Sequence, residues 1–242
     1  MQTKHENIAN ILTDEILSGR YRPGDRLPSE REMAIRFHAN RGAVREAMSR
    51  LSQLGVAAIH RGGARVTPID EANLDIIGYM LSSSELPDAK LLDQIFQVID
   101  RLLAMAAETV VVEASDRQIE NIRTLVQRLL DPSLDGEAHT AARVEMMRAV
   151  MVTSDNLVCQ LIARSLFEQF APSLAAFERY VQLDVDAFTL LMRQLDSALA
   201  VRDRTALRAV FDSLAGLHRE TMLGALAAAS RDAENQPRAA LS

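Results

Sequence analysis

Two arginines one helical turn apart, Arg41 and Arg45, are the side chains of this sequence best suited to bind a charged partner. A guanidinium group is always charged and presents its donors in a fork that matches a phosphate or the edge of a guanine base. Residues four apart share one face of a helix, and the preceding Asn40 is a residue type that caps helix N-termini. We therefore expect a helix that presents the residues of its first turns to nucleic acid.

The opposite side of that helix is apolar. Val44, Met48 and Leu51 recur at helical spacing, which predicts a face packed onto a core. Arg31 begins the preceding predicted helix, where a side chain and backbone amides can hold a phosphate. Each arginine taken singly is better explained as a solvating residue on the surface of a small helical domain. Their arrangement together favours DNA.

The residues around these arginines predict the elements that position them. Apolar residues recur at helical spacing until Gly19 ends the first helix. Ser29 is a capping residue, and Glu32 stands at the capping-box offset. The expected helices span residues 8–17, 30–38 and 41–54, and a hairpin follows at residues 56–69. This order is the plan of a winged helix-turn-helix.

The expected wing carries Arg61 and Gly62 at its tip, within the run His60-Arg61-Gly62-Gly63. Glycine lacks a Cβ atom, so a backbone with two glycines can approach a DNA groove closely. We expect Arg61 and Gly62 to contact DNA together with Arg31, Arg41 and Arg45.

Charge is distributed unevenly along the 242 residues. The formal net charge is −6, but residues 1–70 hold 11 Lys and Arg against 8 Asp and Glu, and ten of those 11 are arginine. The N-terminal part therefore carries +3 and the remainder −9. Only the N-terminal part has the charge balance of a nucleic-acid binder.

The rest of the chain predicts a mainly α protein. Six or seven amphipathic helices follow one another with short breaks, which is typical of an all-α bundle. The expected parts are a DNA-binding domain at residues 1–70, an effector-binding and dimerisation domain at 71–230, and a flexible tail at 231–242. A single cysteine, Cys159, excludes an internal disulfide and a cysteine zinc cluster. No apolar run suits a membrane span and no signal peptide is evident, so we expect a cytoplasmic protein.

The segment "LPSEREMAIRFHANRGAVREAMSRLSQLG" with the later "RGG" resembles the DNA-binding domain of the GntR family of bacterial transcription regulators. The resemblance covers residues 8–67 and implies DNA contacts at Arg31, Arg41, Arg45 and the wing at Arg61 and Gly62. Asn40 stands where the family usually has serine, and Arg61 occupies a position that varies in the family.

An acidic all-helical second domain after such a head resembles the FadR subgroup, whose effector domain is of the FCD type. Most members of that subgroup hold a metal ion with one Asp and three His side chains. Their positions fall here on residues that are not metal ligands: Arg143, Met147, Met192 and Leu214. His218 is one turn beyond Leu214 and is better explained as a surface or capping histidine. We therefore expect no metal and no cofactor.

Two interpretations of the second domain remain open. Arg143, Met147, Met192 and Leu214 line an effector pocket in the first, which suits a carboxylic acid or an acyl species such as acyl-CoA because methionine adapts to apolar guests. In the second, the methionines form an ordinary core and the domain senses nothing. Either way we expect a homodimeric regulator, a repressor rather than an activator, and not an enzyme, because no convergent set of titratable residues is evident.

Overall fold

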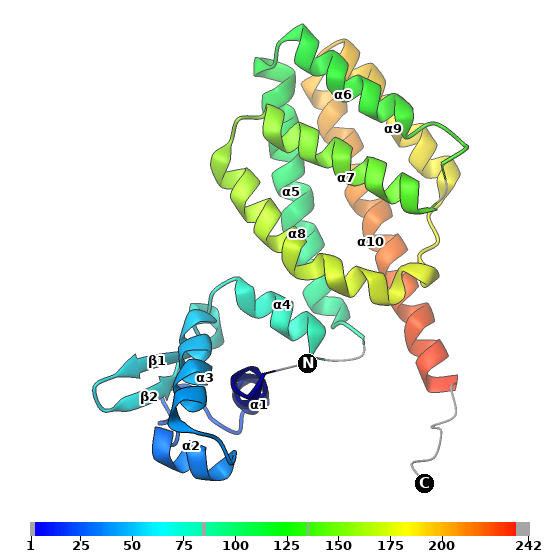
Figure 1. Ribbon diagram of the computed structural model, residues 1–242. Coiled ribbons are helices and arrows are strands. Elements are labelled where there is room, and N and C mark those ends of the chain that lie inside the picture. The colour runs from blue at the N-terminus through cyan, green and yellow to red at the C-terminus, as the bar shows by residue number, and fades with distance from the viewer. Residues whose placement is uncertain (1–2, 84–85, 135, 236–242) are drawn as a thin grey trace. The chain divides into compact units, whose positions relative to one another are not determined.

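The computed structural model describes residues 3–83, 86–134 and 136–235 (Figure 1). Clustering of the backbone divides the chain into two compact units, residues 1–83 and 84–242. The division falls after α4 (Asp75–Ser82), whereas the sequence suggested a boundary at residue 70. The reason lies in the contacts of α4, since Ile76 is buried in the N-terminal core and the Tyr79 hydroxyl is 2.7 Å from the carbonyl oxygen of Asn10.

The three helices of the N-terminal unit begin at capping residues. They are α1 (Lys4–Leu17), α2 (Glu30–Arg36) and α3 (Arg41–Gln53). Thr3 and Ser29 form capping boxes with Glu6 and Glu32, and the Asn40 side chain accepts from the amide of Ala43. Helix α1 starts four residues earlier than periodicity predicted, because the Thr3 box adds a first turn without apolar residues.

The core of this unit gathers the apolar residues that helical spacing singled out. Its fully buried members come from all three helices: Ile8, Leu12, Met33, Val44, Ala47 and Leu51. The predicted apolar face of α3 is confirmed, since Met48 is also buried at 7% exposure.

The predicted hairpin is confirmed as β1 (Ala57–His60) paired antiparallel with β2 (Gly63–Val66). The segment before α2 adds to the free edge of β2. The Gly24 amide donates to Val66 at 2.8 Å and the Leu27 amide to Ala64 at 2.9 Å. The segment at residues 24–27, which leads into α2, is therefore hydrogen-bonded to the wing strand β2, whose place is seen in Figure 1.

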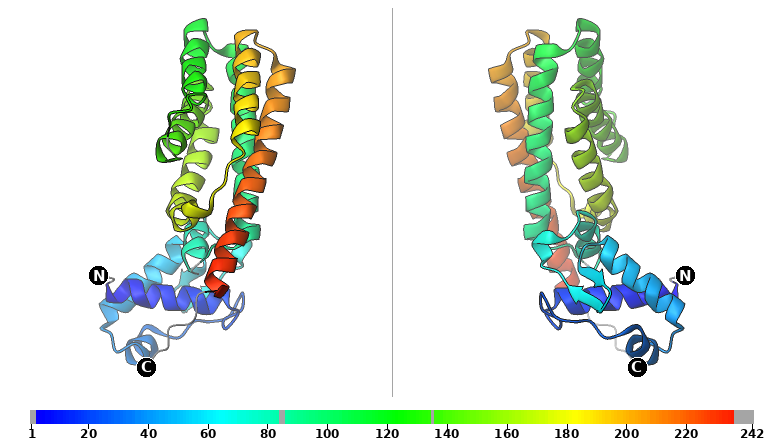
Figure 2. Two further views of the ribbon diagram at one scale, coloured as in Figure 1. Left: turned by 90° about the vertical axis from the view of Figure 1, so that its right-hand side faces the viewer. Right: turned by 90° about the vertical axis from the view of Figure 1, so that its left-hand side faces the viewer.

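Six α-helices make up the described part of the second unit, which confirms a mainly α fold. They are α5 (Ala89–Glu113), α6 (Asp116–Arg128), α7 (Gly136–Thr153), α8 (Leu157–Phe177), α9 (Val185–Ala200) and α10 (Arg204–Asn235), with a 3₁₀ turn at Glu178–Tyr180. Helices α5 and α10 run side by side along the bundle (Figure 2). The proposed tail at 231–242 is helical as far as Asn235, and its remainder lies outside the described residues.

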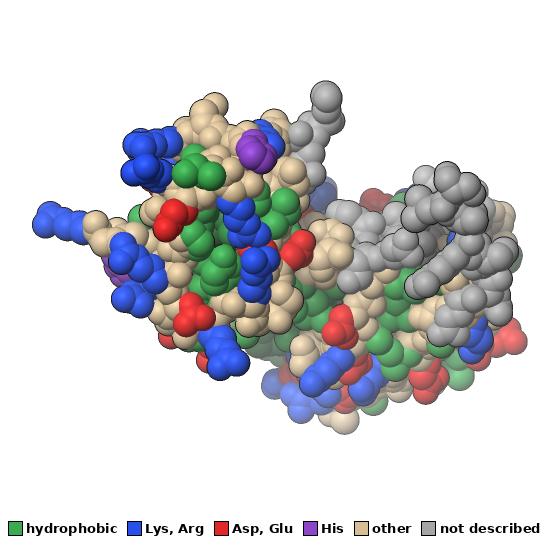
Figure 3. All heavy atoms as spheres, turned by 90° about the horizontal axis from the view of Figure 1, so that it is seen from below, with side chains coloured by type: hydrophobic (Ala, Val, Ile, Leu, Met, Phe, Trp, Pro, Cys, Tyr) green, Lys and Arg blue, Asp and Glu red, His purple; other side chains and the backbone are tan. Residues whose placement is uncertain are grey.

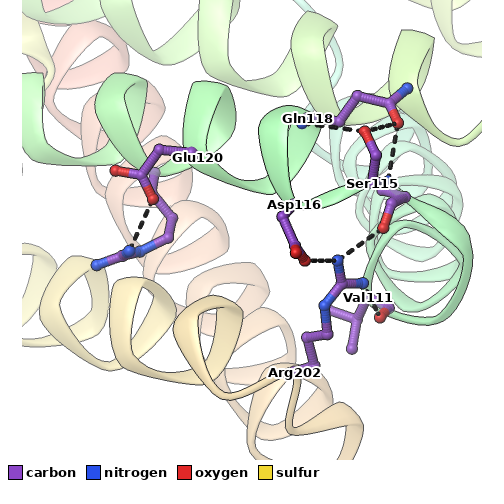
Figure 4. Close-up of polar contacts among 8 residues, drawn as sticks. Val111, Ser115, Asp116, Gln118, Glu120 and Arg202 are labelled. Atoms are coloured by element: carbon purple, nitrogen blue, oxygen red, sulfur yellow. Dashed lines mark hydrogen bonds and ion pairs between the residues drawn. The ribbon is translucent and has the colours of Figure 1, made fainter.

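The side chain of an arginine connects two interhelical turns at one end of this bundle. Arg202, in the α9–α10 turn with a φ of 55°, donates to the carbonyl oxygens of Val111 at 3.0 Å and Ala114 at 2.7 Å, and to Asp116 at 2.8 Å (Figure 4). The last carbonyls of a helix lack intrahelical partners and carry partial negative charge, so a guanidinium satisfies them. Arg202 therefore joins the C-terminus of α5 to the turn between α9 and α10.

Within the described residues, no helix combines the length and apolarity needed to cross a membrane.

Candidate DNA-binding surface and effector cavity

The first two turns of α3 present Arg41 and Arg45 as exposed side chains. The amide of Ala43 donates to Asn40 Oδ1 at 2.8 Å, which fixes where the helix begins. Val44, between the two arginines in sequence, is fully buried. The helix is therefore anchored by one face while two guanidinium groups project from the other.

Arg45 is paired with the first residue of the neighbouring helix. Its Nη2 lies 3.4 Å from Glu30 Oε2, and this hydrogen bond raises the pKa of Arg45. The two side chains are 73% and 42% exposed, so water screens the pair and a phosphate can replace the carboxylate. The pair also places the N-terminus of α2 beside the first turns of α3.

The other predicted DNA contacts lie on separate elements. Arg31 is the second residue of α2 and is exposed. Arg61 and Gly62 form the exposed turn between the paired residues His60 and Gly63. Figure 3 shows Lys and Arg side chains protruding from the face of the N-terminal unit that is turned to the reader.

Two arginines that the sequence analysis did not single out hold the wing in place. Arg26 Nη2 donates to the carbonyl oxygen of Gly62, and Arg65 Nη1 donates to that of Gly24 at 2.8 Å. Gly63 has a φ of +119°, and a Cβ atom there would come within 3.2 Å of Arg26 Nε. The positive φ favours glycine at this position, and the nearby Arg26 side chain leaves little room for a Cβ atom.

A buried carboxylate joins α1 to α2. Glu15 has a side chain only 11% exposed and forms ion pairs with Arg20 and Arg36. The Arg36 hydrogen bond, measured at 2.8 Å between Nη1 and Oε2, lowers the pKa of Glu15. This contact fixes α2 on the helix that precedes it, so Arg36 serves the fold.

The second unit encloses a cavity of about 280 Å³ between α5, α7, α8 and α10. Residues one turn apart on α7 line it, among them Arg143 and Met147 from the predicted pocket. Most of the remaining wall is apolar: Phe96, Ile99, Val144, Phe167, Phe170, Ala171, Val181 and Met222. Neighbouring rings pack edge to face, with centroids 5.4 Å apart for Phe96 and Phe170.

Met192 and Leu214 do not line this cavity. They border an adjacent hollow of only about 10 Å³ and are 0% and 4% exposed, so both belong to the packed core. Arg143 and Met147 border that hollow too, which places all four predicted residues in one region of the bundle.

The ionisable residues among those that line the cavity are Arg143, Asp100 and His218. Burial lowers the pKa of Arg143, and the nearby Asp100 opposes that effect. A guanidinium stays protonated even so. The described residues offer Arg143 no hydrogen-bond or ion-pair partner, only a ring contact with Phe188 at 5.8 Å from Cζ to the centroid.

The N-terminal unit matches a known protein family. Residues 4–66 match the family described as bacterial regulatory proteins of the gntR family. The head of this chain is a GntR-family DNA-binding domain. The chain is accordingly a DNA-binding transcriptional regulator rather than an enzyme.

Similarity to individual proteins extends beyond the head. The chain is 27% identical over 178 residues to the HTH-type transcriptional regulator Mce2R of Mycobacterium tuberculosis, covering 71% of this chain and 72% of that protein. It is 24% identical over 177 residues to the galactonate operon transcriptional repressor of Escherichia coli, covering 69% and 76%. A solved structure of Lar, which controls the agr system of Listeria monocytogenes, shares the fold with a TM-score of 0.51 at 18% identity, covering 93% of this chain and 97% of that one.

The residues of the second unit do not fit the metal site of the FadR subgroup. Guanidinium, thioether and aliphatic side chains stand at the four expected ligand positions, and two of them are core residues. Across the described ranges, no three His, Cys, Asp or Glu side chains gather as a metal site requires. His139 packs edge to face on Phe188, and burial lowers the pKa of His139.

Two polar residues of the regulator's cavity were missed or misjudged from sequence. His218, interpreted as a surface or capping residue, has a side chain only 14% exposed, with Nδ1 3.7 Å from Asp100 Oδ1. Asp100 was not singled out at all. Helical spacing on α5 and α10 could have placed each on an inward face, but no local signal shows that these faces meet.

Proposed function

We propose that this GntR-family regulator is a homodimeric, sequence-specific repressor of the FadR subgroup. Its DNA contacts are assigned to Arg31, Arg41, Arg45, Arg61 and Gly62. Its helical unit dimerises and senses a small carboxylic acid or acyl compound without a bound metal.

The assignment of DNA contacts rests on the geometry of α3. Two guanidinium groups project from its first turns while the opposite face is buried, and this is how a recognition helix meets base edges in the major groove. The exposed Arg31 and the turn at Arg61 and Gly62 suit contacts to phosphates on either side. This arrangement of α3 is the single observation that carries the proposal.

A dimer follows from how such heads read DNA. One recognition helix covers only a few base pairs, and a two-fold pair of heads reads two half-sites of a palindrome. The named repressor among the similar proteins favours repression for this chain as well.

Sensing is supported by the cavity. A largely buried guanidinium that finds no hydrogen-bond or ion-pair partner among the described residues is costly unless a ligand supplies one. The cavity around Arg143 is apolar, of ligand size and bounded by four helices, which are the features of a small-molecule site.

The DNA assignment is tested by selecting binding sites from random DNA with the full chain. A palindromic site should emerge, and Arg45→Ala should weaken binding to it by roughly 1–3 kcal/mol. Arg50→Ala, which removes an exposed arginine from the last turn of α3, is the matched control. Equal losses for the two variants, or no preferred site, would reject the assignment of Arg45.

Sensing is tested by measuring operator affinity with and without the small-molecule fraction of a cell extract. The fraction should change the affinity of the wild-type chain, and Met147→Trp, which fills the cavity, should remove that response. An unresponsive wild type would favour the alternative of a dimeric DNA-binding protein with a filled, non-sensing helical unit. A response that survives Met147→Trp would place sensing elsewhere.

A further inference from the structure

The cavity of the helical unit has a guanidinium in its wall whose donors are not taken up by any described residue. Its ionisable wall residues are Arg143, Asp100 and His218. Arg143 has no hydrogen-bond or ion-pair partner within the described chain, whereas the neighbouring exposed arginines of the unit do: Arg101 pairs with Asp212 and Arg219 with Asp93. A guanidinium group with free hydrogen-bond donors in a mostly apolar cavity is suited to bind one anionic group.

His218 adds a second polar atom without a partner beside the same cavity. Its Nε2 is buried without a hydrogen-bond partner, and its Nδ1 is 3.7 Å from Asp100, beyond hydrogen-bond distance. Imidazole nitrogens either donate or accept. Because His218 lines the cavity with Arg143, a small rotation of its ring would bring this nitrogen to a ligand oxygen bound at Arg143.

Asp100 limits the charge of the ligand. Its carboxylate lines the same cavity and already acts on Arg143 through its charge. A second anionic group would meet this carboxylate and a mostly apolar wall, in which the described residues offer no further Lys or Arg. Dicarboxylates, phosphate esters and the multiply charged coenzyme A group are thereby disfavoured.

Shape and lining limit the rest of the ligand. The volume of about 280 Å³ lies at the lower end of ligand pockets, which run from roughly 300 to 1,000 Å³. Phe96, Phe167, Phe170, Met147 and Met222 surround it, and methionine and aromatic side chains pack well on compact apolar bodies.

Resting on the sensing function proposed above, we infer that the cavity selects small apolar monocarboxylic acids, with Arg143 binding the carboxylate and His218 contacting it. The phenylalanines and methionines hold the carbon skeleton. An acyl-CoA, which the sequence left as an option, does not suit this cavity.

The test compares probes of matched size by titration calorimetry with the full chain. Hexanoate and phenylacetate should bind. Hexanamide, which lacks the charge, adipate, which adds a second carboxylate, and hexanoyl-coenzyme A should each bind at least tenfold more weakly. Arg143→Gln should weaken hexanoate binding tenfold or more, as expected when a charge-assisted hydrogen bond is lost.

Arg148→Gln is the matched control, because Arg148 is an exposed residue of the same helix. Circular dichroism establishes that each variant is folded, and Arg143→Lys, which keeps a charge, should retain part of the binding.

Three results would overturn the inference: equal binding by Arg143→Gln, adipate or hexanoyl-coenzyme A binding as tightly as hexanoate, or no binding of either monoacid. These results are independent of the extract experiment described above. If the extract changes the operator affinity of the wild-type chain but neither monoacid binds, the inferred ligand class is wrong and the sensing function stands. If the extract has no effect on the wild-type chain, the proposed sensing function is wrong.

Discussion

Arg45 of α3 and Glu30 of α2 form an ion pair across the helix-turn-helix, with 3.4 Å between Nη2 and Oε2. The carboxylate contacts the guanidinium group when no DNA is bound. It also occupies the donors that a base or phosphate would use, so binding must exchange one acceptor for another.

Replacing Glu30 with glutamine should therefore alter specificity more than stability. Glu30→Gln removes a negative charge that competes with phosphate, so affinity for random DNA should rise severalfold. Preference for the operator should fall because Arg45 is no longer positioned. Fluorescence anisotropy on operator and scrambled DNA measures both. Glu46→Gln removes an exposed charge from α3 without breaking a pair; the same outcome there would show a simple net-charge effect.

The wing glycines should separate folding from DNA contact. Gly63→Ala forces a side chain onto a φ of +119° and against Arg26, and should cost about 1–3 kcal/mol of stability. A Cβ atom added at Gly62 would have no neighbour within 4 Å, so Gly62→Ala should leave the melting temperature unchanged and weaken DNA binding. Thermal melts with DNA titrations would test this; equal melting temperatures for the two variants would contradict it.

The Glu15 carboxylate should contribute acid sensitivity to the N-terminal unit. Its pKa is lowered from 4.5 by the Arg36 hydrogen bond, so its stabilising contribution is complete above pH 4.5 and is lost as the pH falls through the lowered pKa. Glu15→Gln should cost about 1–3 kcal/mol at pH 7 and flatten the loss of stability below pH 4.5. Urea unfolding across pH 3–7 gives both quantities. An unchanged acid slope would show that other carboxylates dominate.

Met192 and Met147 should respond differently to truncation. Met192 is fully buried, so Met192→Ala should destabilise the helical unit by about 2–5 kcal/mol. Met147 borders the open cavity and leaves a smaller defect, so Met147→Ala should cost less than half as much. Denaturant unfolding followed by circular dichroism compares them, and equal costs would mean that the cavity is filled in solution.

The N-terminal unit was predictable to the level of individual residues because its signals are local. Asn40, Ser29 and Glu32 act within one turn of the helices that they cap, and the buried face of α3 follows from spacing alone. The pair between Arg45 and Glu30 was not predicted. It joins residues 15 apart, and no short-range rule states how α2 lies against α3.

The sequence by itself determined the winged helix-turn-helix, the exposed arginines of α3 and an all-helical second unit without metal ligands at the expected positions. Only the tertiary structure decided that α4 packs with the N-terminal unit. It also decided that Met192 and Leu214 are core, and that Asp100 and His218 share a cavity with Arg143. Caps and periodicity depend on neighbours within a few residues, whereas a cavity is what remains after helices far apart in sequence have packed.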